Sequence, residues 1–238
     1  MPFESLQGAT FTRDQVAIAF TRGAFGTGHL GIAFHSAHDG PKVTHLAWHQ
    51  QLQVDTIPQE VQGCWACATV TLPPSASKQL VAVVRAVSKK KPQINYGLAA
   101  IAAKGSFSAN GSYKPPRGSD GLTCTTFVVE VFRAASIPLV NYQNWPSDPA
   151  NVAWGESVCT ELARRGASQE HVDAVRKNIG GLRVRPYEAV GAALLPPNQR
   201  PAVHADVQVG AASADTALNT ICPRKQQIML FAQPQGPA

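Results

Sequence analysis

The sequence predicts an α+β fold in which an antiparallel sheet packs on helices. Four short apolar or alternating runs have the pattern of strands, and the segments between them are rich in Gly, Pro and Asp. These runs cover residues 16–20, 29–34, 42–48 and 67–72. Helical periodicity begins only after them, and this order of strands first and helices second is typical of the α+β class.

Three segments in the middle of the chain predict helices. Residues 75–91 follow a Pro-Pro-Ser start with apolar residues at helical spacing, residues 96–104 are rich in Ala, and residues 124–137 stop before Pro138. The intervening residues 105–121 contain the Gly, Pro, Asn and Ser punctuation of a loop.

The last hundred residues have weaker signals. Residues 168–181 predict a capped helix closed by glycines, and residues 224–233 predict a late strand. We therefore expect one core over residues 10–140 and a C-terminal extension, residues 141–238, packed on it.

Composition places the chain among globular proteins and argues against several partners. It has 238 residues, 44% of them hydrophobic and 15% charged, and no apolar run long enough to span a membrane. The net charge of +6 is dispersed rather than gathered in a basic stripe, so we expect no nucleic-acid partner. The first residues lack the basic and apolar regions of a Sec signal, which predicts a protein made in the cytoplasm.

The five cysteines argue against a disulfide framework, since their number is odd and they are scattered. At least one thiol should therefore be free. Cys64 and Cys67 have the spacing of a zinc or redox pair, but no second such pair exists, so buried thiols are the favoured interpretation.

Cys124 has the strongest chemical signal in the chain. A Gly-rich loop delivers it to the first turn of an apolar helix, where the helix dipole favours a thiolate, should lower the thiol pKa and supplies N–H donors for an oxyanion. The alternative is a small buried residue on a core helix. A nucleophilic thiol also needs a base, for which histidine is the usual residue.

Five of the seven histidines fall between residues 29 and 49. His29 and His45 lie on consecutive predicted strands joined by a turn that a hairpin can close, so their side chains can meet on one face of the sheet. If the start of the 124–137 helix reaches that place, the site holds a nucleophile, a base and an orienting group.

The other histidines leave alternatives open. His49 is a substitute for the orienting group, and His204 competes with His29 as base because residues 203–209 also fit a strand. A zinc site of three histidines, His29, His45 and His49, lacks an accompanying HExxH motif or carboxylate pair, and we expect no metal. We expect His35, His38 and His171 at the surface.

Three motifs, GHLGIAF at 28–34, KVTHLAWH at 42–49 and GLTCTTFVVEVF at 121–132, resemble the circularly permuted NlpC-like branch of the papain-like cysteine peptidase fold. The resemblance implies that Cys124 is the nucleophile, His29 the general base and His45 the third member. It makes Tyr96, within INYGL, and Thr123, which stands where many members have an acidic residue, candidate oxyanion or substrate contacts.

The function that this resemblance implies is a cysteine peptidase or amidase without a cofactor, cleaving amide bonds in peptidoglycan stem peptides. Without a Sec signal, such an enzyme fits an effector toxin that a type VI-like machine delivers to a target-cell periplasm, with a secretion-apparatus partner and an immunity protein. The same fold hosts acyltransferases and thioesterases of the lecithin:retinol acyltransferase type, and effectors that cleave or deamidate host proteins. These remain alternatives.

Overall fold

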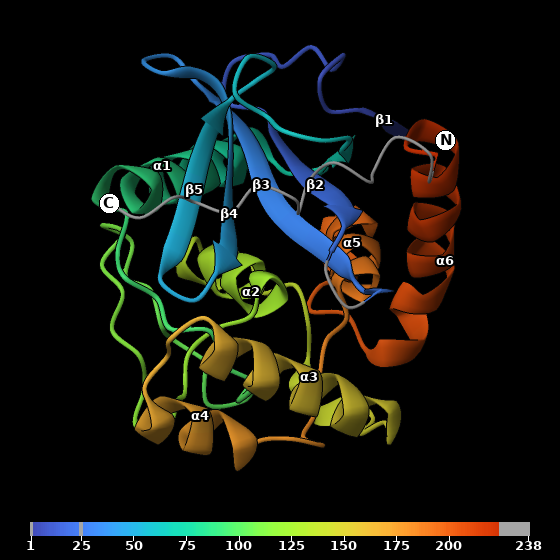
Figure 1. Cartoon of the computed structure of the whole chain (residues 1–238). Helices are drawn as coiled ribbons and strands as arrows, with labels where there is room; N and C mark the ends of the chain where they lie inside the picture. Colours follow the sequence, from blue (N-terminus) through green and yellow to red (C-terminus); the bar gives the residue numbers. More distant parts are fainter. Residues whose placement is uncertain (1, 24–25, 224–238) are drawn as a thin grey trace.

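The computed structural model describes residues 2–23 and 26–223, in which an α+β protein is built on one antiparallel sheet (Figure 1). The six strands are β1 (Phe3–Ser5), β2 (Val16–Arg22), β3 (Gly28–Ser36), β4 (Gly40–Trp48), β5 (Gln51–Thr56) and β6 (Ala66–Thr69). Their order across the sheet is β1-β6-β2-β3-β4-β5, and every neighbouring pair is antiparallel. The predicted fold class is confirmed at this level.

The four predicted strands correspond to β2, β3, β4 and β6, whereas the two edge strands were not predicted. β1 has three residues, too few for an alternating pattern to be recognised. β5 alternates polar and apolar residues but is mostly polar and follows β4 after a two-residue turn, so the sequence gives no boundary between them.

Six α-helices follow the sheet within the described part of the chain. They are α1 (Pro74–Lys90), α2 (Cys124–Ala134), α3 (Ala150–Arg164), α4 (Gln169–Arg176), α5 (Pro186–Leu194) and α6 (His204–Ile221). α1, α2 and α4 confirm predicted helices, whereas α3, α5 and α6 were not predicted. The described helices include none that is both long enough and apolar enough to cross a membrane. The strand predicted at residues 224–233 lies outside the described residues.

The helix predicted at residues 96–104 is wrong, because this Ala-rich segment forms turns. The backbone amides of Leu98 and Ala99 each donate to the Asp120 carboxylate at 2.9 Å, and the Leu122 amide donates to the Asn95 carbonyl at 2.9 Å. These long-range hydrogen bonds override the local helix propensity. They also hold the segment beside the start of α2.

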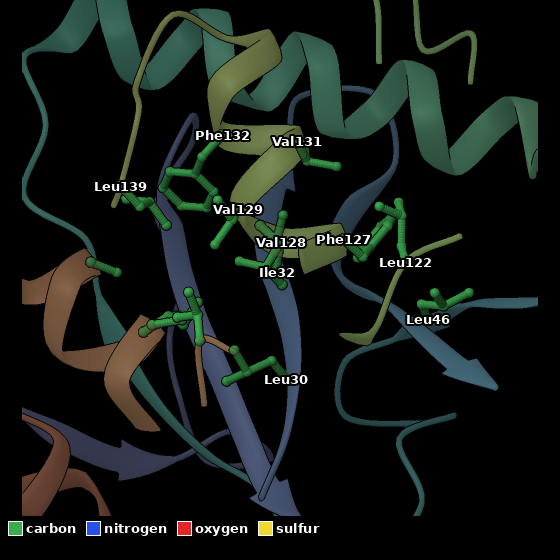
Figure 2. Packing of buried hydrophobic residues seen from close by; sticks show 14 of the residues in the cluster. Leu30, Ile32, Leu46, Leu122, Phe127, Val128, Val129, Val131, Phe132 and Leu139 are labelled. Carbon is green, nitrogen blue, oxygen red and sulfur yellow. The ribbon is translucent and has the colours of Figure 1, made fainter. Parts of the chain in front are cut away.

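The main core lies between the sheet and helices α1, α2 and α5. Leu30 and Ile32 of β3 project toward the apolar residues of α2, as Figure 2 shows. The extension contributes to the same core, since Val190 of α5 and Leu218 of α6 belong to its buried cluster. Figure 1 shows α6 alongside the β1 edge, with α5 between it and α2.

The other face of the sheet is covered by loops rather than helices. Small residues on that face, such as Ala19 and Ala33, let the cover approach closely. The cover consists of apolar residues from the N-terminal segment and from the loop before β6, namely Leu6, Phe11, Ile57 and Trp65. His29 and His45 lie on this loop-covered face, beside Trp65.

A disulfide joins Cys64 to Cys222, although the number and scatter of the cysteines argued against a disulfide framework and favoured a buried thiol at Cys64. The other three cysteines are free and buried, so the expected free thiol is confirmed. Scattered cysteines gave no signal for this pair because the two residues are 158 positions apart and meet only when α6 packs at the sheet edge. The bond ties the end of α6 to the residue that precedes Trp65.

Loss of the disulfide is expected to lower the free energy of unfolding by about 2–5 kcal/mol, because the crosslink restricts a long loop in the unfolded chain. Denaturant unfolding of the wild type with and without reductant, and of Cys222→Ser, measures this. The variant should be insensitive to reductant. Five titratable thiols in the unfolded, non-reduced wild type, instead of three, would contradict the crosslink.

Candidate active site

His29 and His45 are held together by the pairing of β3 and β4. His29 Nε2 lies 2.9 Å from His45 Nδ1, and the two rings meet edge to face. Gly31 lies beside His45, and a Cβ on this glycine would come within 3.1 Å of the His45 Cβ. The sheet therefore brings together two of the three predicted catalytic residues on one face.

Asp55 extends this pair into a line of three side chains. It lies on β5, and its Oδ2 is 3.5 Å from His45 Nε2. A carboxylate only accepts, so His45 Nε2 carries the proton and His45 Nδ1 accepts from His29 Nε2. This arrangement leaves the lone pair of His29 on Nδ1, where no described residue forms a hydrogen bond.

Burial keeps both imidazoles neutral. Trp65, only 5% exposed, packs against the two rings with centroids 5.5 Å and 5.1 Å away. Removal from water lowers the pKa of His29 to about 4. Burial also lowers the pKa of His45, although the hydrogen bond to Asp55 opposes that shift. His29 is therefore an unprotonated base at neutral pH.

Cys124 is the first residue of α2 and is fixed there by a capping box. The Thr123 hydroxyl accepts from the Thr126 amide at 3.1 Å, and the Thr126 hydroxyl accepts from the Thr123 amide at 2.7 Å. The polar groups of Thr123, predicted as an oxyanion or substrate contact, are therefore engaged within the cap. Their contribution here is to position the thiol.

The thiol of Cys124 is 6% exposed and protonated at neutral pH. Burial raises its pKa, while the Leu30 backbone N–H, the Thr125 hydroxyl and the positive charge of Arg183 act in the opposite direction. The expected low pKa is therefore not found, because burial outweighs the helix start. A thiol in this state needs a base at the moment of attack.

Cys124 approaches β3 from the helix side. Side chains alternate along a strand, so His29 projects to the face opposite Leu30 and Ile32. Within the described residues, no hydrogen bond joins Cys124 to His29. The Leu30 N–H acts on the pKa of the Cys124 thiol, so the thiol lies near the strand that carries His29. Since the thiol and the His29 imidazole lie on opposite faces of β3 without a hydrogen bond, proton transfer between them requires one of the two side chains to change its position.

Tyr96 lies near the same thiol. The segment that carries it runs beside residues 120–122. The approach is so close that a Cβ on Gly121, which also has a positive φ, would lie 2.1 Å from the Asn95 carbonyl oxygen. The Tyr96 ring stacks on Trp48, and burial raises the pKa of its hydroxyl, with the Cys124 charge adding to the shift. Tyr96 and Cys124 are thus within electrostatic reach of each other.

The remaining histidines lie apart from this line. The His49 ring packs against the His171 ring, and its Nδ1 accepts a hydrogen bond from the Tyr96 amide at 3.3 Å. His204 begins α6, and its Nε2 lies 3.3 Å from the Glu188 carboxylate. His38 is exposed as expected, whereas His35 is half-buried in β3 and bonded to the Phe11 carbonyl. Among the residues described, no cluster of three or more His, Cys, Asp or Glu side chains is suited to a metal ion.

Sequence reasoning missed Asp55 and Arg183. Asp55 had a signal, an acidic residue shortly after His45 in an alternating run, but β5 was not recognised as a strand. Arg183 lies in the segment before α5 and shifts the pKa of Cys124 through its charge. No local pattern links it to residues sixty positions earlier.

Comparisons of the chain with protein-family models, with curated proteins and with solved structures found no match.

Proposed function

We propose that the protein is a cysteine hydrolase of amide bonds, with a permuted papain-like, NlpC-like arrangement of its catalytic residues. The observation that carries this proposal is the line Asp55–His45–His29, which holds an unprotonated imidazole on β3, the strand against which α2 and its first residue Cys124 pack. His204 forms contacts with Glu188 and Trp145 instead, which favours a base upstream of the nucleophile.

The proposed reaction starts once a change in the position of His29 or Cys124 has brought the two side chains together. The Cys124 proton passes to His29 Nδ1 as Sγ attacks the amide carbonyl carbon, and His29 then returns that proton to the leaving nitrogen. This gives a thioester on Cys124 and a free amine. Water, deprotonated by His29, attacks the thioester carbonyl, and the carboxylic acid leaves as the thiol re-forms. Tyr96 is the candidate contact for the negative oxygen of the tetrahedral intermediate.

Bacterial cell-wall stem peptide is the substrate class that we propose, on the resemblance of the three motifs. The Cys64–Cys222 disulfide supports the proposal that the protein acts in an oxidising compartment, such as the periplasm of a target cell. Delivery by a type VI-like machine, with a secretion partner and an immunity protein, is the route that we propose for it.

The test is mass spectrometry of purified peptidoglycan and of disaccharide peptides after incubation with the protein. New stem-peptide fragments with free amino and carboxyl ends support the proposal. Unchanged muropeptides, together with hydrolysis or transfer of thioester or lipid acyl groups, would favour the acyltransferase alternative. Cleavage or deamidation of host proteins would favour the third alternative.

The orienting role of His45 predicts a graded effect. His45→Ala is expected to lower kcat by about 10- to 1,000-fold, because His29 loses the group that fixes its ring and tautomer. His45→Asn and His45→Gln, which can still accept from His29 Nε2, should recover part of that loss. Equal inactivity of all three variants, with chelator-sensitive wild-type activity, would contradict this role and favour a metal ligand.

A further inference from the structure

A pocket of about 500 Å³ opens beside the start of β3. It lies between that strand, α3 and the segment that leads into α5, and its lining includes Gly28, Asn151, Trp154 and Arg183. Gly28 directly precedes His29, so one wall of the pocket continues into the backbone of the candidate site. The extension supplies most of the remaining wall.

Arg183 offers an unused positive charge in this pocket. Its guanidinium stacks on the Trp154 ring, 3.4 Å from the centroid, and forms no hydrogen bond or ion pair with any described residue. The two acids that act on Arg183 electrostatically already have partners of their own. Glu188 is bonded to the Trp145 indole, the Arg185 amide and His204, and Asp148 is bonded to Arg185 and the Ala150 amide. The Trp154 ring holds the guanidinium plane in place without neutralising it.

The charge of Arg183 reaches the candidate catalytic residues. Burial lowers its pKa to about 10, so it stays protonated at neutral pH, and the Cys124 and Tyr96 charges both act on it. Arg185, which lines the same pocket, is exposed and paired with Asp148. Asp148 therefore offsets the charge of Arg185, whereas Arg183 has no such ion pair among the described residues and is the arginine more available to a ligand.

Asn151 supplies a second, independent feature. It is 4% exposed and lines the pocket, yet its Oδ1 has no hydrogen-bond partner among the described residues. A buried carbonyl oxygen without a partner is costly, and a turn of the Asn151 amide toward the pocket would let this oxygen accept from an N–H donor on a ligand. The pocket thus combines an unpaired cation with an unpaired acceptor.

We propose that this pocket is a substrate subsite in which Arg183 binds a carboxylate and Asn151 accepts a neighbouring peptide N–H. The ligand is a peptide that carries a free carboxylate close to the amide that Cys124 attacks. Arginine suits this role because its planar guanidinium binds a carboxylate through two parallel hydrogen bonds. This inference rests on the proposed function, since it takes Cys124 as the reacting group.

Alkylation of Cys124 tests the subsite without any turnover. Iodoacetate and iodoacetamide differ mainly in charge, and each transfers a carbon to sulfur with loss of iodide. The rate ratio of iodoacetate to iodoacetamide is measured for Cys124 by peptide mass spectrometry and divided by the same ratio for free cysteine. In the wild type we expect this normalised ratio to be about 10, because Arg183 attracts the carboxylate of iodoacetate.

Arg183→Gln should bring the normalised ratio close to that of free cysteine, and Arg183→Lys should retain part of the excess. Arg185→Gln is the matched control, an arginine in the same pocket with its own partner, and should keep most of the excess. A wild-type ratio unchanged by Arg183→Gln, or no labelling of Cys124 by either reagent, would overturn the subsite. Because the ratio cancels general accessibility and needs no hydrolysis, a failed muropeptide assay and a failed subsite are distinguishable.

Discussion

Cys124→Ala is expected to abolish amide hydrolysis while the protein stays folded. The substitution removes one sulfur atom at the start of α2, and the capping box of Thr123 and Thr126 that begins the helix is untouched. Loss of the covalent step should lower kcat/KM by about 10,000-fold or more. Muropeptide hydrolysis followed by liquid chromatography measures the rate, and circular dichroism measures the fold.

Cys159→Ala provides the matched control for this prediction. Cys159 is also a buried free thiol, but it lies on α3 and contacts the Val172 carbonyl. The same chemical change there should affect stability to a similar degree and leave hydrolysis at the wild-type level. Wild-type turnover by folded Cys124→Ala, or inactivity of both variants, would contradict a nucleophilic role for Cys124.

The sequence predicted the fold class because the relevant signals are local. β2, β3 and β4 are long apolar strands, and α1 and α2 have clear starts and helical periodicity. The segment around Tyr96 was predicted wrongly because its conformation depends on Asp120 and Leu122, which approach it only in the folded protein. Local propensity carries no information about those partners.

In the candidate site, too, the features that depend on local sequence could be predicted, and those that depend on distant partners could not. His29 and His45 could be paired from the sequence because they lie on consecutive strands of a hairpin. The protonation states could not be predicted, because they depend on Trp65 and on the packing around Cys124, and burial outweighs the helix dipole that the sequence suggested. Asp55 decides the tautomer of both imidazoles and became visible only once β5 was placed beside β4.

His29→Ala is expected to be nearly as damaging as the loss of Cys124, with kcat/KM lower by about 1,000- to 10,000-fold. The thiol pKa is raised, so without its base few molecules carry a thiolate at neutral pH. Substitutions within one catalytic unit do not have additive effects, so the double variant His29→Ala with Cys124→Ala should have the same kcat/KM as either single variant. His204→Ala should remain active. The reverse result, an inactive His204→Ala and an active His29→Ala, would contradict a base upstream of the nucleophile.

The pH dependence of the wild type tests the proposed role of His29 as base independently of mutation. Its pKa is lowered from an ordinary 6.5 to about 4, so the unprotonated form persists as the pH falls and is lost only near pH 4. The acid limb of log kcat/KM should therefore lie near pH 4. The same lowered pKa makes folding stability decline as the pH falls below 6.5, because the unfolded chain takes up the proton first, so circular dichroism must accompany each rate. An acid limb near pH 6.5 in the folded protein would indicate a solvated base in place of His29.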